Sequence, residues 1–223
     1  MRLDRFEIIN EEFTASAITQ SQLDRLLADG WRHFGPHFFR YNFGVYENEL
    51  RRVIPLRIRV EDFAPSKSQR RAIRRNADLE TIVQPILLTE ETHQLFGRHK
   101  ARFTSGVPDS LYDFLPRGPS ESPTTILEVS VSKSERLVAA SYFDVGETSI
   151  SSIYGIFDPK ETARSLGIFT MLVEIKFARE QGHTLYYHGY AYEGQSYYDY
   201  KKRFGAMERF DWAGNWSEFD ADA

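Results

Sequence analysis

The chain has 223 residues, of which 41% are hydrophobic and 14% aromatic, and its formal net charge is −4 at pH 7. This composition excludes an intrinsically disordered chain and allows a buried core in one large or two small domains. The absence of cysteine excludes disulfides, thiolate nucleophiles and thiolate metal sites. No stretch approaches the 18 or so uncharged apolar residues of a membrane span and no targeting segment is recognisable, so we expect a cytoplasmic protein with no membrane partner.

The first quarter of the chain predicts one helix followed by strands. Residues 21–29 carry three leucines at helical spacing, and Gly30 follows as a stop signal. The aromatic, turn-rich residues 31–50 are typical of short strands. Hydrophobic and charged residues alternate in residues 53–63, which predicts a strand with one buried face.

A basic helix is predicted next, in the segment PSKSQRRAIRRN at residues 65–76. Ser66 or Ser68 can cap it by accepting a hydrogen bond from a free backbone N–H group. Two pairs of its arginines lie four positions apart, where like charges repel. The pattern favours an anionic partner, and a solvated surface or carboxylates of the same chain are the alternatives. The cationic side chains are Lys67, Arg70, Arg71, Arg74 and Arg75.

The remaining elements predict a mixed α and β domain. Residues 88–103 have a helical pattern, and the prolines and glycines of residues 104–123 indicate a loop or lid. Residues 124–158 contain three strand-like segments, typical of an antiparallel meander. A helix at residues 168–181 and a strand at residues 184–192 follow. Because strand, helix and strand occur in that order, we expect a βαβ unit with parallel strands.

Several common catalytic sites are excluded by their motifs. His33 and His37 are separated by Gly and Pro, and His93 and His99 are six positions apart, so neither pair suits a metal on one helix face. The chain has no HExxH, GxSxG, GxxxxGK[ST] or GxGxxG sequence. We therefore expect no metal, and no serine-hydrolase, P-loop or dinucleotide site.

Two segments are candidates for ligand binding. The turn ARSLG, residues 163–167, precedes a helix, where free backbone N–H groups, Arg164 and Gly167 suit a phosphate or carboxylate; helix capping alone is the alternative. Residues 186–205 contain seven tyrosines interspersed with cations, which suits stacked bases or, alternatively, simple packing. Together with the basic helix, these segments favour a polyanionic ligand that carries a base or adenosine.

Three stretches resemble one known family. FAPSKSQRRAIRRNADL, residues 63–79, resembles the F-x-P-S-[RK]-S-Q-R-R stretch of the arginyl-tRNA–protein transferases and the bacterial aspartate/glutamate leucyltransferases. Residues 155–204, from GIFDPKETARSLG to YYDYKKRF, are similar to that family's second signature, and LLADGWRHFGPHFFR, residues 26–40, resembles its opening. The family's four cysteines have no counterpart, and His188 and Tyr198 replace a leucine and a methionine of the second signature.

The resemblance implies a GNAT-type acyltransferase fold in residues 61–223, with a mixed central sheet flanked by helices, and a small N-terminal region in residues 1–60. It implies transfer of an amino acid of the arginine or leucine class from charged tRNA to the N-terminal amine of a protein or peptide. Charged tRNA would be the co-substrate, and no cofactor is implied.

The resemblance also assigns residues to roles. The five cations of the basic helix would bind tRNA phosphates. Glu193, Tyr200 and Lys201 would line the transfer site, where Glu193 accepts the amine proton and Tyr200 donates to the oxyanion or the departing ribose oxygen. The aminoacyl-adenosine end would be bound by Arg164, Ser165, Leu166 and Gly167.

Two other functions remain as alternatives. An acyl-CoA-dependent N-acyltransferase would need a fuller glycine-rich turn than RSLG and would not need the basic helix. A non-catalytic tRNA-binding homologue would bind tRNA in a salt-sensitive manner without transferring an amino acid.

Overall fold

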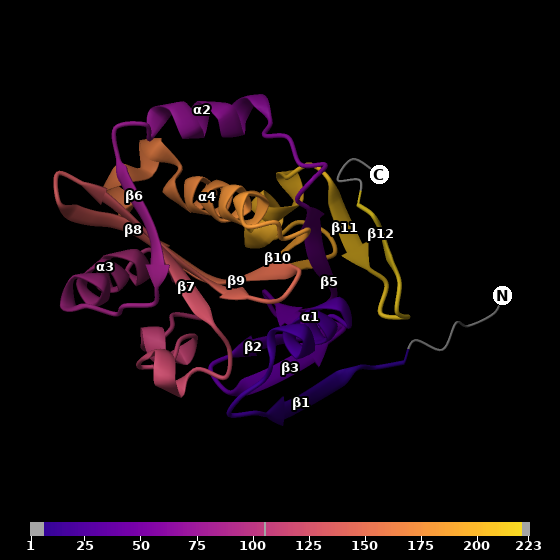
Figure 1. Cartoon of the computed structure of the whole chain (residues 1–223). Helices are drawn as coiled ribbons and strands as arrows, with labels where there is room; N and C mark the ends of the chain where they lie inside the picture. The colour runs from indigo at the N-terminus through magenta and orange to yellow at the C-terminus, as the bar shows by residue number, and fades with distance from the viewer. Residues whose placement is uncertain (1–6, 105, 220–223) are drawn as a thin grey trace.

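The computed structural model describes residues 7–104 and 106–219, which form two sheets and the helices around them (Figure 1). The larger sheet has nine strands. Eight of them, in spatial order, are β12 (Trp216–Glu218), β11 (Met207–Phe210), β5 (Glu49–Arg59), β10 (Leu185–Tyr192), β9 (Ser149–Phe157), β8 (Arg136–Val145), β7 (Ile126–Lys133) and β6 (Glu80–Pro85). The ninth, β4 (Phe43–Tyr46), pairs with β5.

The smaller sheet belongs to the N-terminal part of the chain. Its strands, in spatial order, are β1 (Asn10–Thr14), β3 (His37–Tyr41) and β2 (Arg32–Phe34). The division of the chain at residue 60 stays a prediction; β5, which precedes it, pairs with β10 and β11 in the larger sheet.

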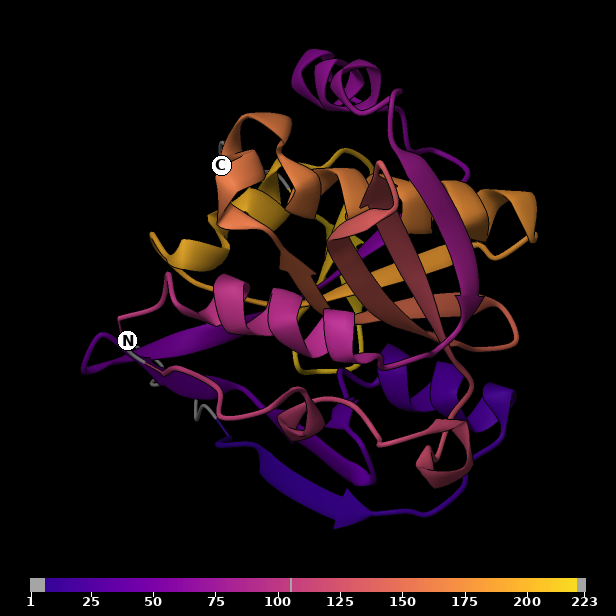
Figure 2. The ribbon, with the colours of Figure 1, turned by 90° about the vertical axis from the view of Figure 1, so that its left-hand side faces the viewer.

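Helices cover both faces of the larger sheet. On one face α4 (Leu166–Glu180) packs over β7 to β10, and α2 (Lys67–Arg75) lies outside α4, as Figure 2 shows. On the other face lie α3 (Glu90–Lys100), α1 (Gln20–Ala28) and the smaller sheet. The predicted mixed central sheet flanked by helices is confirmed.

The pair β9 and β10 differs from its neighbours because it is parallel. Only three residues of each strand are in register, Ser149–Ser151 and Leu185–Tyr187. Beyond them a bulge interrupts β10 between Tyr187 and Gly189, and β10 continues against β5. The two strands therefore part in the middle of the sheet, and this opening is lined by groups from distant segments.

Local signals predicted most elements correctly. Ser66 caps α2 in a capping box with Gln69, and Gly30 and Gly182 follow α1 and α4 with positive φ angles, as predicted. Within the described residues of the segment 104–123, the helical structure is limited to two 3₁₀ turns, η1 (Leu111–Asp113) and η2 (Pro119–Glu121). Leu111 and Leu115 in it are buried against α3, so the segment is anchored to the core at these residues rather than only covering it.

Candidate active site

Arg32 of β2 lies at the point where β9 and β10 part. Its Nη1 donates to Ser151 Oγ at 2.7 Å and to the carbonyl oxygen of Tyr187 at 3.5 Å, and its Nη2 donates to the carbonyl oxygen of Ser152. Because Ser151 and Tyr187 form the last paired position of the two strands, the guanidinium group bridges the base of the opening.

Lys201, from the 3₁₀ segment η4 (Tyr197–Arg203), is a second cation beside Arg32. Its Nζ donates to the carbonyl oxygen of Tyr190 at 3.2 Å. Gly189 lies between the two cations: a Cβ atom there would be 3.0 Å from Lys201 Nζ and 3.7 Å from Arg32 Nη2. Burial, and then the charge of Arg32, lower the pKa of Lys201 to about 7.

Glu174 of α4 places a fully buried carboxyl group beside the same opening. The Tyr186 O–H group donates to its Oε2 at 2.7 Å, and Oε1 has no hydrogen-bond partner among the described residues. Burial raises the pKa of Glu174 to about 7, a rise that the hydroxyl groups of Ser141 and Ser152 moderate. A carboxyl group with this pKa can accept and release protons at neutral pH.

His188 is the least well paired polar residue of the site. It is 2% exposed, its ring lies between those of Tyr186 and Phe204, and neither ring nitrogen has a partner with hydrogen-bonding geometry among the described residues. Burial, followed by the charges of Lys201 and Arg32, lowers the pKa of His188 to about 3. The ring is therefore neutral at physiological pH.

We expect His188→Leu to raise the free energy of unfolding by about 1–3 kcal/mol at pH 7, because it removes buried, unpaired ring nitrogens. The gain should increase by about 2 kcal/mol at pH 5. The reason is that the unfolded histidine, with its ordinary pKa of 6.5, takes up a proton there and the folded one does not. Urea unfolding at the two pH values measures both effects. His37→Leu, at a half-exposed histidine, is the control and should change stability by less than about 0.5 kcal/mol.

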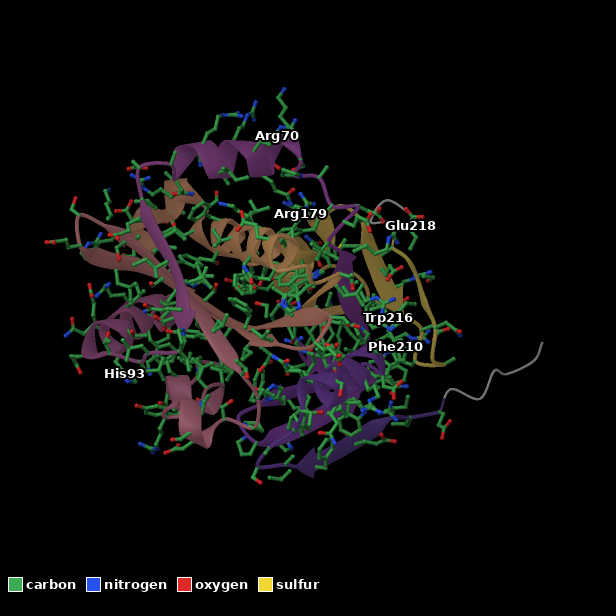
Figure 3. The ribbon with its side chains drawn as sticks, viewed as in Figure 1. Arg70, His93, Arg179, Phe210, Trp216 and Glu218 are labelled. Carbon is green, nitrogen blue, oxygen red and sulfur yellow. The ribbon has the colours of Figure 1, made fainter. Side chains whose placement is uncertain are left out.

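The basic helix α2 presents its charges to solvent. All five predicted tRNA-binding side chains are exposed, and none forms an ion pair with a residue in the described part of the chain. Arg70 points away from the molecule in Figure 3. Arg75 donates to the carbonyl oxygen of Ala163, and Asn76 Nδ2 to that of Arg164 at 2.9 Å, which fixes α2 beside the turn that precedes α4.

The predicted aminoacyl-adenosine site is only partly available. Arg164 donates from Nη1 and Nη2 to both carboxylate oxygens of Asp78 at 2.8 and 2.9 Å, and from Nε to Glu161 at 3.1 Å. The side chain of Leu166 is buried in the main core. Ser165 is left-handed, at φ 55°, and its side chain does not cap α4. What the turn can offer an anion is therefore its backbone N–H groups.

The three predicted catalytic residues lie in different environments. Lys201 is half-buried beside Arg32, and Tyr200 is half-buried against the main core. Glu193 is exposed just beyond β10, where its backbone N–H donates to the carbonyl oxygen of Arg52 at 2.9 Å.

Arg32 and Glu174 were not among the predicted site residues. Glu174 had a local signal, because it lies three positions after Met171 and one before Ile175 on the apolar face of the helix, where a carboxylate is unusual. For Arg32 the sequence offered no local signal beyond its position in the segment GWRHFG. Among the residues described, no group of three or more His, Asp or Glu side chains is arranged to hold a metal ion. No helix within residues 7–104 and 106–219 is long and apolar enough to span a membrane.

The similarity to solved structures is distant, whereas the sequence matches one family closely. A crystal structure of a C-terminal DUF2156 domain from Agrobacterium fabrum superposes with a TM-score of 0.50 at 16% identity, over 63% of this chain and 48% of that one. This similarity concerns the fold alone. The sequence comparison is more specific.

Residues 4–71 match the family described as arginine-tRNA-protein transferase, N terminus, and residues 91–211 match its C terminus. The chain therefore belongs to the arginine-tRNA-protein transferase family and is an aminoacyl-tRNA-dependent transferase. Among its relatives is an aspartate/glutamate leucyltransferase of Stenotrophomonas maltophilia, 33% identical over 183 residues, 76% of this chain and 70% of the relative. Another, from Xanthomonas campestris pv. campestris, is 36% identical over 175 residues, 74% of this chain and 69% of the relative.

Proposed function

We propose that the protein transfers leucine from charged tRNA to the N-terminal amine of proteins or peptides that begin with aspartate or glutamate. The names of the relatives support both the donor and the acceptor. We place the reaction in the cytoplasm, with charged tRNA as the co-substrate and no further cofactor.

The observation that carries the proposal is the opening between β9 and β10, which holds a proton-exchanging carboxyl group on one side and two cations on the other. In the transfer, the acceptor nitrogen attacks the ester carbonyl and the bond from this carbon to the ribose oxygen breaks. The amine loses a proton and the ribose oxygen gains one, so no external oxidant or reductant is needed. Because the ester is already activated, alignment, proton transfer and oxyanion stabilisation suffice.

Two carboxylates are candidates for accepting the amine proton. We favour Glu174, because a base is most effective when its pKa lies near the working pH and burial gives Glu174 such a pKa. Glu193 remains the second candidate, since it is exposed at the end of β10. Tyr200 is proposed to donate to the oxyanion or to the ribose oxygen, and the α2 cations to bind tRNA phosphates.

Replacing both Arg70 and Arg74 by alanine should weaken tRNA binding and flatten its salt dependence. Each lost phosphate contact lowers the slope of log Kd against log salt concentration by roughly 0.7–0.9, so the double variant should lose about 1.4–1.8. Filter binding with bulk tRNA across a salt series measures the slope. The double variant Arg25→Ala/Arg117→Ala, at exposed arginines outside α2, should keep the parent slope; an equal loss there would remove α2 from the tRNA interface.

A transfer assay tests the whole proposal. The protein is incubated with tRNA charged with labelled leucine or arginine and with peptides that differ in their first residue. Label from leucyl-tRNA in peptides that begin with Asp or Glu is the expected result. Binding of charged tRNA without transfer to any peptide would favour the non-catalytic alternative. Failure to bind tRNA, with acetyl transfer from acetyl-CoA, would favour the acyl-CoA-dependent enzyme.

A further inference from the structure

The pair formed by Arg32 and Lys201 has no role in the proton transfer described above. Both side chains are half-buried, and both approach Gly189, where a Cβ atom would lie 3.0 Å from Lys201 Nζ and 3.7 Å from Arg32 Nη2. Gly189 is at φ +97°, a conformation that residues with a side chain rarely adopt. The bulge in β10 therefore brings two cationic groups to one point, where the absence of a side chain lets both approach the backbone.

The charge of this pair is not neutralised by the protein. Neither residue forms an ion pair with a residue in the described part of the chain. The acidic groups that act on Arg32 from nearby are Asp144 and Glu174, and both have other partners. Asp144 accepts from His33 and Thr124, and Glu174 accepts from Tyr186. Two like charges held together in a partly buried place favour an anion between them.

The position of the pair favours the acceptor over the tRNA as the source of that anion. The tRNA cations lie on α2, outside α4, whereas Arg32 belongs to the smaller sheet on the other face of the larger sheet. A guanidinium group also presents N–H donors in a plane, which matches a carboxylate, and an ammonium group adds a third donor. Glu174 and Tyr186 lie beside the same opening, where the amine of the acceptor's first residue would have to react.

We infer that Arg32 and Lys201 bind the side-chain carboxylate of the acceptor's first residue and so determine the preference for aspartate and glutamate. This assignment rests on the proposed function for its substrate. Arg32 lies in the N-terminal family match, residues 4–71, and Lys201 lies in the C-terminal match, residues 91–211. A role in specificity explains why these two cations lie together at a glycine bulge without an acidic partner.

The test compares peptides that begin with Glu or Gln, which have the same shape and differ in charge. With the parent protein, kcat/KM should favour the Glu peptide. Lys201→Met should lower this Glu-to-Gln ratio by about 10- to 100-fold, because one charged hydrogen bond to the ligand is lost. Lys201→Arg, which keeps the charge, should preserve most of the ratio. Arg203→Met, at an exposed cation of the same segment, is the matched control and should change nothing.

A second measurement separates this inference from the proposed function. Isothermal titration with the Glu and Gln peptides, in the absence of tRNA, gives the same ratio as a binding preference. If the parent transfers no amino acid but binds the Glu peptide more tightly, and Lys201→Met abolishes that preference, the inference stands and the proposed function fails. An unchanged ratio in active or binding-competent Lys201→Met overturns the inference. So does binding of adenosine monophosphate that Lys201→Met abolishes without altering the peptide ratio, which would assign the pair to a tRNA phosphate.

Discussion

Glu174→Gln is expected to lower kcat/KM for amino acid transfer by about 100-fold or more at pH 7, the usual contribution of a general base. The parent activity with an uncharged acceptor side chain should rise between pH 6 and 8, because the pKa of Glu174 is raised to about 7 and its carboxylate form accumulates over this range. In the glutamine variant, only the part of the rise that comes from deprotonation of the acceptor's amine, with an ordinary pKa of about 8, should remain. Transfer rates measured at a series of pH values with the Gln peptide provide the test.

The acidic acceptors should behave differently at higher pH. The pKa of Lys201 is lowered to about 7, so its positive charge is lost as pH rises through that value. Transfer to the Glu peptide should therefore follow a bell-shaped profile, rising with Glu174 ionisation and falling as Lys201 loses its proton.

Loss of activity in Glu174→Gln should not come from loss of folding. The pKa of Glu174 in the folded protein lies above its ordinary 4.5, so the protein loses stability as pH rises from 4.5 through about 7. Removing the charge should leave stability at pH 7.5 unchanged or increased. Glu193→Gln and Glu180→Gln are the comparison variants. Full activity in Glu174→Gln combined with its loss in Glu193→Gln would make Glu193 the base, and Glu180→Gln, on the exposed end of α4, should be neutral.

The elements that the sequence predicted well are those whose signals are local. The capping box of α2 needs only Ser66 and Gln69, three positions apart, and the helical spacing of apolar residues in α4 lies within fifteen residues. The βαβ order likewise predicted the parallel strands β9 and β10. Side-chain roles were harder, because their partners come from distant segments.

Arg164 and Arg32 illustrate this limit. Arg164 was predicted to bind an anionic ligand, yet its partner Asp78 lies 86 positions earlier in the chain, in a turn that no pattern connects with it. Arg32 bonds to Ser151, 119 positions later, and becomes part of the opening only because the smaller sheet packs on the larger one. A motif can place an arginine beside a helix N-terminus, but only the tertiary fold decides whether another residue has already paired with it.

Asp144→Ala is expected to cost about 3–5 kcal/mol of unfolding free energy, because it breaks a buried ion pair and leaves one partner unpaired. His33 Nε2 lies 2.9 Å from Asp144 Oδ2, and the two side chains are 2% and 1% exposed. Thr124 donates to the other carboxylate oxygen at 2.6 Å. The pair joins β2 to β8, and so it fixes the smaller sheet, with Arg32, on the larger one.

The cost should depend on pH in a defined direction. Burial alone would lower the pKa of His33, but the charge and hydrogen bond of Asp144 outweigh it and raise that pKa above 6.5. The stabilisation is therefore complete below pH 6.5 and is lost as pH rises through the raised value, so Asp144→Ala should be more damaging at pH 6 than at pH 9. Urea unfolding at both pH values measures this, with Asp109→Ala at an exposed position as the control. A pH-independent cost would mean that His33 is neutral in the fold, and that hydrogen bonding rather than charge holds the N-terminal sheet and Arg32 in place.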